Sequence, residues 1–88
     1  MTSILVVEDY PPTLEAVSES LQTEGYEVVE ATTGTEALNC FDNTVPDLIV
    51  LDVAIPAPDG FAVCAEVRHR PGRYIPIIFV SVLDELET

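Results

Sequence analysis

Basic residues are the scarcest feature of this sequence. Its 88 residues include sixteen aspartates and glutamates but only three basic residues, Arg68, Arg70 and Arg73, and no lysine. The formal net charge is −13, and a surface with that charge repels phosphate backbones and anionic lipid. We therefore expect no direct nucleic-acid binding and no membrane binding by this chain. An acidic surface suits a metal cation or a basic partner protein instead.

Cysteines, long apolar stretches and leader signals are also scarce or missing. Cys40 and Cys64 are too few for a disulfide scaffold, and we interpret them as small core residues of a protein in a reducing compartment. No run approaches the ~20 apolar residues that a membrane helix needs. The first residues lack the positively charged opening of a signal peptide. Together these absences predict a cytoplasmic location.

What the chain does have is enough apolar material for one packed core. Hydrophobic residues make up 48% of it, which excludes a disordered tail. A typical domain has about 100–150 residues, so the length allows one small domain. No repeat, low-complexity tract or linker divides the sequence, and we predict a single domain over residues 1–88.

Short apolar runs alternate with stretches of helical periodicity. Pro11 opens one helix and Gly25 ends it, and Thr33 with Glu36 forms a capping-box pattern before the next helix. The strands are continuously apolar, as strands buried on both faces are. We predict strands over 4–7, 26–31, 48–51 and 75–80, helices over 11–24, 33–43 and 60–70, and the opening of a further helix over 83–88.

This β-α-β-α-β-α-β order predicts a doubly wound α/β domain. Short connections and right-handed crossovers make the sheet parallel and place helices on both of its faces. In the third helix we expect Phe61, Cys64 and Val67 to be the apolar residues. Arg68 and Arg70 are expected in its last turn, where positive charge favours the helix dipole.

Polar residues follow three of the predicted strands. Glu8 and Asp9 follow the first, Asp52 ends the third and Ser81 follows the fourth. Ligands of such sheets bind at the carboxyl ends of the strands, and neighbouring strands lie ~5 Å apart. Each acid alone is most simply a solvated loop residue. Together at one edge, three carboxylates either gain raised pKa values or bind a hard cation, and Mg²⁺ suits them best.

Several motifs strongly resemble the receiver domain of two-component response regulators. They are Ile4–Asp9 before a helix, the pattern Leu51-Asp52-x-x-x-Pro56-x-x-Asp59-Gly60, and the segments 25–28 and 33–38. The spacing from Asp52 to Gly60 is the specific part of the resemblance. It implies a flavodoxin-like receiver fold with strand order 2-1-3-4-5. Pro56, Asp59 and Gly60 are interpreted as structural residues that set the loop and the entry into the third helix.

The resemblance also implies a role in a phosphorelay. Asp52 would accept a phosphoryl group from the phosphohistidine of a sensor histidine kinase or a phosphotransfer protein. Mg²⁺ would be held by Asp52, by Asp9 directly, by Glu8 through water and by the backbone carbonyl of Ala54. Ser81 would donate a hydrogen bond to a phosphoryl oxygen. Such a domain is a signalling phosphoacceptor rather than an enzyme.

The sequence departs from the family pattern in three ways. A complete receiver continues with a full helix, a fifth strand that follows a lysine, and a last helix, so the resemblance implies a domain truncated after the fourth strand. Without the lysine, self-catalysed phosphotransfer should be impaired. Val82 is larger than the residue usual at that position. The exposed edge of the fourth strand should favour self-association.

Two alternatives stay open at the level of sequence. The first is a pseudo-receiver, an interaction module with the fold but without phosphorylation, which Mg²⁺ affinity would distinguish. The second, a flavin-binding electron carrier, is disfavoured because Glu8, Asp9 and Tyr10 would repel a phosphate at the first loop. The residues do not specify an output domain or the cognate kinase.

Overall fold

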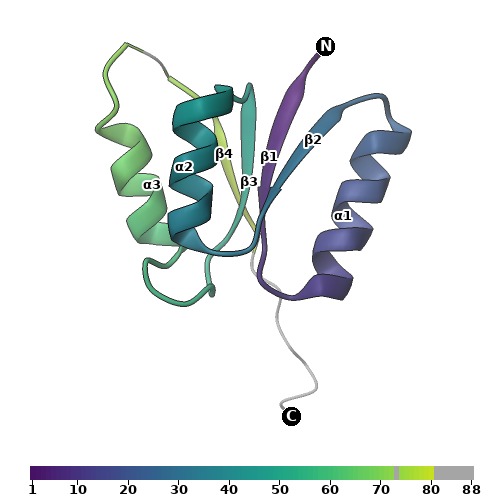
Figure 1. Ribbon diagram of the computed structural model, residues 1–88, viewed down its shortest axis with the longest axis horizontal. Helices are drawn as coiled ribbons and strands as arrows, with labels where there is room; N and C mark the ends of the chain where they lie inside the picture. The colour runs from purple at the N-terminus through teal and green to yellow at the C-terminus, as the bar shows by residue number, and fades with distance from the viewer. Residues whose placement is uncertain (73, 81–88) are drawn as a thin grey trace.

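The computed structural model describes residues 1–72 and 74–80, which form alternating strands and helices. The sheet is parallel throughout, with the strand order β2-β1-β3-β4 (Figure 1). The predicted fold class and strand order are therefore confirmed for these residues. The elements are β1 (Ser3–Val7), α1 (Pro11–Thr23), β2 (Glu27–Ala31), α2 (Gly34–Thr44), β3 (Leu48–Asp52), α3 (Gly60–Arg68) and β4 (Ile77–Val80).

Helices cover both faces of the sheet, as the order of elements predicts. Figure 1 shows α2 and α3 on one face and α1 on the other. Alternate strand residues point to opposite faces, so each face has its own core. The larger core lies under α2 and α3 and the smaller one lies under α1. The larger contains Leu5, Val7, Ala31, Ala37, Phe41, Ile49, Leu51, Ile55, Val63, Val67 and Ile75, and the smaller contains Ile4, Val6 and Leu14.

The ends of α1 follow from proline and glycine chemistry. Pro11 and Pro12 occupy the first turn, where a missing N–H leaves no hydrogen bond unmade. Past the other end, Gly25 has a φ of 96°, and its N–H donates to the carbonyl of Gln22 at 2.9 Å. A residue with a Cβ is strained in that conformation. The prediction that Gly25 ends this helix is confirmed.

A threonine side chain caps α2. The Thr33 Oγ1 accepts the backbone N–H of Glu36 at 3.0 Å, as the capping-box pattern predicts. The Glu36 carboxylate does not complete that box, because it accepts the backbone N–H of Thr32 at 2.7 Å. The Glu36 carboxylate therefore holds Thr32, while Thr33 caps the helix. Both residues are fixed where the chain enters α2.

Three details of the third helix and the fourth strand differ from the sequence predictions. The helix α3 ends at Arg68 rather than reaching Arg70, although the Arg70 guanidinium still donates to the Glu66 carbonyl in the last turn at 3.1 Å. Phe61 is exposed and packs on the Phe79 ring, with centroids 5.3 Å apart, since the buried side of α3 is the one carrying Val63. β4 begins at Ile77, because Pro76 has no N–H to add to the ladder.

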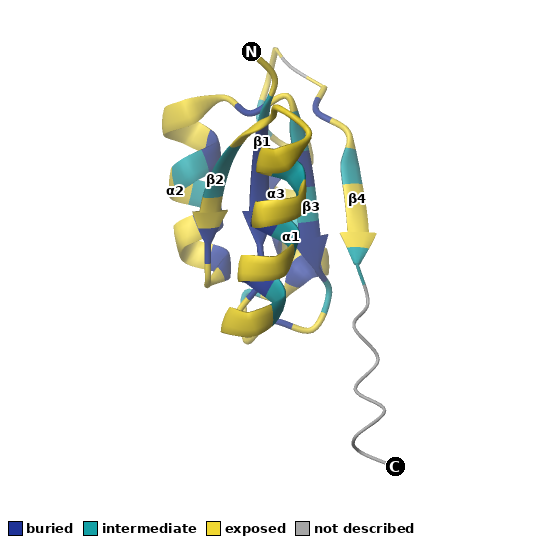
Figure 2. Ribbon diagram, turned by 90° about the vertical axis from the view of Figure 1, so that its right-hand side faces the viewer, coloured by how far each residue is buried: buried dark blue, intermediate teal, exposed yellow. Residues whose placement is uncertain are grey.

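Coverage of the sheet is uneven on the α1 side. The helix α1 packs against β1 and β2. Among the described residues no helix covers this side of β4, which lies at the edge of the sheet (Figure 2). Ile78 of β4, the register partner of Val50, points to this side and is 51% exposed, whereas Phe79 points to the other side, where it packs on Phe61 of α3. In the described residues β4 pairs with β3 alone. The predictions for Ser81, Val82 and a helix over 83–88 lie outside the described residues.

Candidate functional site

Glu8, Asp9 and Asp52 meet at the carboxyl ends of two adjacent strands. Val7, the last residue of β1, is the register partner of Leu51 in β3, so the residues that follow each lie side by side. One carboxylate oxygen from each of the three acids lies within 4.8 Å of the others. Glu8 and Asp52 are 4% and 5% exposed, whereas Asp9 is open to solvent. The structure thus brings together the three acids that the strand ends predicted.

The Asp52 carboxylate is held by the loop that follows it. Its Oδ1 accepts the backbone N–H of Ala54 at 3.0 Å. A hydrogen bond to the residue two positions on restricts the rotation of an aspartate side chain. The carboxylate therefore has a defined orientation at the site. The role predicted for the Ala54 carbonyl, as a metal ligand, stays a prediction.

Burial and neighbouring charge act strongly on Glu8. They raise the pKa of its carboxyl from 4.5 to about 7. Burial is the largest cause, and a hydrogen bond with Asp52 and the charges of Asp52 and Asp9 add to it. The backbone N–H of Tyr10 donates to Glu8 Oε2 at 3.0 Å and opposes the rise in pKa. Ionisation of Glu8 beside the other two carboxylates is therefore unfavourable unless a counter-ion is present.

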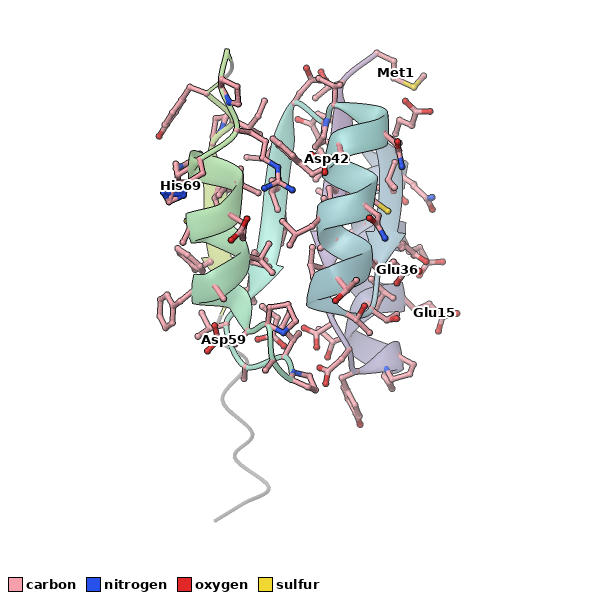
Figure 3. All side chains as sticks on the ribbon, turned by 60° about the vertical axis from the view of Figure 1, so that its left-hand side comes forward. Met1, Glu15, Glu36, Asp42, Asp59 and His69 are labelled. Atoms are coloured by element: carbon pink, nitrogen blue, oxygen red, sulfur yellow. The ribbon has the colours of Figure 1, made fainter. Side chains whose placement is uncertain are left out.

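The basic side chains of the described residues do not supply that counter-ion. Arg68 donates to the carbonyl of Ile75 at 2.8 Å. Arg70 binds Asp42 and Glu66 between α2 and α3, and Figure 3 shows Asp42 on the side of α2 that faces α3. Three clustered carboxylates, with their oxygens this close, fit a hard divalent cation such as Mg²⁺.

Gly60 fixes the loop beside Asp52 by close backbone contact. A Cβ on Gly60 would lie 2.6 Å from the carbonyl oxygen of Asp52 and 2.7 Å from the Cα of Val53. The Gly60 N–H donates to the Val53 carbonyl at 3.1 Å, and Asp59 Oδ1 caps α3 by accepting the N–H of Ala62 at 2.9 Å. The structural interpretation of Asp59 and Gly60 is confirmed, and the loop is anchored at both of its ends.

Gly34 is a second close contact, and sequence reasoning missed it. A Cβ on Gly34 would meet the carbonyl oxygen and the side chain of Pro58, and the γ2 carbon of Val63. The loop before α3 therefore packs directly on the first turn of α2. The sequence did contain a signal for this contact, since the first position of a capped helix does not require the conformational freedom of glycine. A glycine there therefore indicates a close neighbour.

A four-stranded parallel sheet in the order 2-1-3-4, with an acid cluster at the carboxyl ends of β1 and β3, defines a doubly wound α/β protein of the flavodoxin-like class. Residues 4–88 match the response regulator receiver domain family. The chain belongs to that family, as the resemblance of its motifs predicts.

Individual relatives agree with this assignment. The chain is 39% identical over 82 residues to the response regulator PleD of Caulobacter vibrioides, covering 92% of this chain and 18% of PleD. It is also 39% identical over 82 residues to PhoP of Bacillus subtilis, the alkaline phosphatase synthesis transcriptional regulatory protein, covering 93% of this chain and 34% of PhoP. The chain thus spans about a third or less of the length of these curated relatives.

A solved structure matches the fold closely. The response regulator protein TrrA from Thermotoga maritima, in complex with Mg²⁺–BeF, has a TM-score of 0.88 and 38% sequence identity to this chain. The match covers 96% of this chain and 72% of that one. Within the residues that the structure describes, none of the helices combines the length and apolar character needed to cross a membrane.

Proposed function

We propose that this chain is the phosphoacceptor of a two-component phosphorelay and that Asp52 carries the phosphoryl group. A carboxylate oxygen of Asp52 would attack phosphorus, forming a P–O bond as the P–N bond of a phosphohistidine breaks. The imidazole nitrogen leaves with the bonding electron pair. The donor would be a sensor histidine kinase or a phosphotransfer protein, and the reaction would take place in the cytoplasm.

The acid cluster supports this proposal. Glu8, Asp9 and Asp52 supply three carboxylates at one point, and the Ala54 carbonyl is proposed as a further ligand of Mg²⁺. The cation, when bound, neutralises charge on the carboxylates and on the incoming phosphoryl group. The hydrogen bond from Ala54 N–H fixes the orientation of the Asp52 carboxylate, so little reorientation precedes attack. Ser81, outside the described residues, is proposed to donate to a phosphoryl oxygen.

We propose that residues 1–88 form the larger part of a receiver domain. The chain covers 72% of TrrA, which leaves room in the family fold for the segment with the lysine strand. Phosphotransfer from small donors should then be slower in this chain than in a version extended along its reading frame. Signal output would belong to other segments or partners, and β4 offers an edge for self-association.

Phosphoryl transfer can be tested by intact-mass spectrometry. The chain and an extended, lysine-containing version are incubated with acetyl phosphate, with Mg²⁺ or with EDTA. We expect a gain of one phosphoryl group that needs Mg²⁺ and disappears in Asp52→Asn. Asp47→Asn is the matched control, since this exposed acid keeps an oxygen that can accept the Ser3 N–H. An extended version that gains no phosphoryl group contradicts the proposal.

The alternative function is an interaction module that keeps the fold without a phosphorylation cycle. It predicts weak Mg²⁺ binding that is unchanged by Asp9→Asn. Our proposal predicts saturable Mg²⁺ binding that Asp9→Asn and Glu8→Gln weaken. Titration calorimetry with MgCl₂ separates the two, because a module without phosphorylation has no chemical need for clustered carboxylates.

A further inference from the structure

Two of the four glycines lie where the backbone does not need glycine. Gly25 and Gly72 have φ angles of 96° and 87°, so their conformation explains them. Gly34 and Gly60 are the first residues of α2 and α3, and neither has a positive φ. Alanine is the better helix former at such positions. Gly34 and Gly60 are therefore explained by the atoms that they contact.

The contacts of these two glycines link α2 to Asp52. A Cβ on Gly34 would collide with the carbonyl oxygen of Pro58 and lie 2.7 Å from its Cγ. Gly60 makes the equivalent contact with Asp52, where a Cβ would lie 2.6 Å from the carbonyl oxygen. Residues 58–60 are thus held by α2 at one end and by the backbone of Asp52 at the other. Figure 1 shows this part of the loop beside the first turn of α2.

The rest of the loop is also held in place. Ile55 is 3% exposed and packs in the larger core. The Gly60 N–H donates to the Val53 carbonyl at 3.1 Å. The Ala54 N–H donates to Asp52 Oδ1 at 3.0 Å. Close-packed segments transmit a displacement instead of absorbing it, so a shift of the loop at its contact with α2 changes the position of Ala54 relative to the acid cluster.

We propose that Gly34 is a positioning residue for the Mg²⁺ site. Because it has no side chain, the loop can lie against α2, and this contact sets where the Ala54 carbonyl and the Asp52 carboxylate lie relative to the other two acids. The nearest atoms to a Cβ on Gly34 belong to Pro58 and Val63 rather than to the acids. The inference rests on the proposed role of Asp52 and Ala54 as Mg²⁺ ligands.

A second glycine separates positioning from stability. Gly25→Ala strains the turn after α1, but a Cβ there meets nothing within 4 Å, so the loop stays in place. Thr35→Ala is a further control, since Thr35 is an exposed residue beside Gly34 in the first turn of α2. If Gly34 contributed to stability alone, all three alanine substitutions would leave the Mg²⁺ affinity of the folded chain unchanged.

The test is a calorimetric titration of the full chain with MgCl₂, at a temperature where circular dichroism shows each variant to be folded. Gly34→Ala should raise the Kd for Mg²⁺ by roughly 5-fold or more, because it displaces the support of a metal ligand. Gly25→Ala and Thr35→Ala should change this Kd by less than about 2-fold. Equal Kd values in Gly34→Ala and Gly25→Ala would overturn the proposal.

An NMR spectrum without metal gives a readout that a purely stabilising residue would not change. In the ¹⁵N-labelled chain, the Ala54 amide should shift in Gly34→Ala, because its hydrogen bond to Asp52 changes, and should keep its position in Gly25→Ala. An unshifted Ala54 amide in Gly34→Ala would overturn the proposal. A parent chain that binds no Mg²⁺ would instead contradict the proposed function, and the Ala54 amide would still show whether Gly34 positions the loop.

Pro58→Ala serves if Gly34→Ala does not fold. It removes the Cγ that lies against Gly34 and adds no collision, so the loop is held less firmly against α2. We expect the Kd for Mg²⁺ to rise by more than about 2-fold and the Ala54 amide to shift. A folded Pro58→Ala variant in which neither changes would overturn the proposal.

Discussion

The protonation of Glu8 is controlled by a few atoms at the end of β1. Its carboxyl is buried beside two further carboxyls, and its pKa in the folded chain is about 7. The unfolded chain has the ordinary pKa of 4.5. The folded state therefore binds more protons between these two values, and stability falls as the pH rises through that range.

We predict that stability without metal is lower at about pH 8 than at about pH 5.5, because Glu8 must ionise in place. Mg²⁺ should remove much of this difference by stabilising the ionised site. Urea unfolding at both pH values, with EDTA or MgCl₂, measures the effect. Glu8→Gln is the control, and its pH dependence should be flatter than that of the parent chain. An unchanged slope in Glu8→Gln would assign the pH effect to the general negative charge.

Gly60 is the second residue on which the site depends. We predict that Gly60→Ala lowers the free energy of unfolding by roughly 2 kcal/mol or more, because the new Cβ collides with backbone atoms that cannot move aside. Gly25→Ala should cost about 1 kcal/mol through backbone strain alone, since a Cβ there meets nothing within 4 Å. Urea unfolding compares the two, and equal losses would argue against the collision.

At the scale of elements, the cap of α2 offers a direct test of local structure. Thr33→Ala removes the oxygen that accepts the Glu36 N–H and should destabilise the chain by about 1 kcal/mol. Thr33→Ser keeps that oxygen and should retain most of the stability. Urea unfolding curves of both variants check this. If Thr33→Ser were as unstable as Thr33→Ala, the threonine methyl group rather than the capping oxygen would be the source of the stability.

The order and type of the elements could be predicted because apolar runs, prolines and glycines act locally. The acid cluster could be predicted as well, since parallel strands bring their carboxyl ends to one edge. The pairing of Arg70 with Asp42 could not, because 28 positions separate the two residues and only the packing of α2 on α3 joins them. The burial of Ser18 could have been predicted from its position one helical turn after Leu14. It was missed because a polar residue is not expected on the buried side of a helix.

At the scale of the whole molecule, an uncovered strand competes with strong charge repulsion. β4 exposes Ile78 and Phe79, and apolar strand edges of this kind promote association. The net charge of −13 opposes the approach of a second copy. Association of the chain with itself should therefore depend on salt, which screens the repulsion between copies.

We predict that sedimentation velocity detects oligomers whose fraction rises with protein concentration and with added NaCl. Ile78→Lys should reduce this fraction, because it places a charge on the apolar strand. Tyr26→Lys is the matched control, since Tyr26 is an exposed aromatic residue at the turn before β2. Equal effects of the two variants would assign the change to net charge rather than to the β4 edge.

The hydrogen bond from Gly60 to Val53 has a consequence for how the site can be observed. It joins the first residue of α3 to the residue after Asp52, so the Gly60 amide hydrogen exchanges with solvent when that junction opens. The rate of deuterium uptake at this amide therefore reports how often the junction next to the acid cluster opens. Timing that exchange with and without Mg²⁺ would record how tightly the two ends of the loop are closed, with no label attached to the protein.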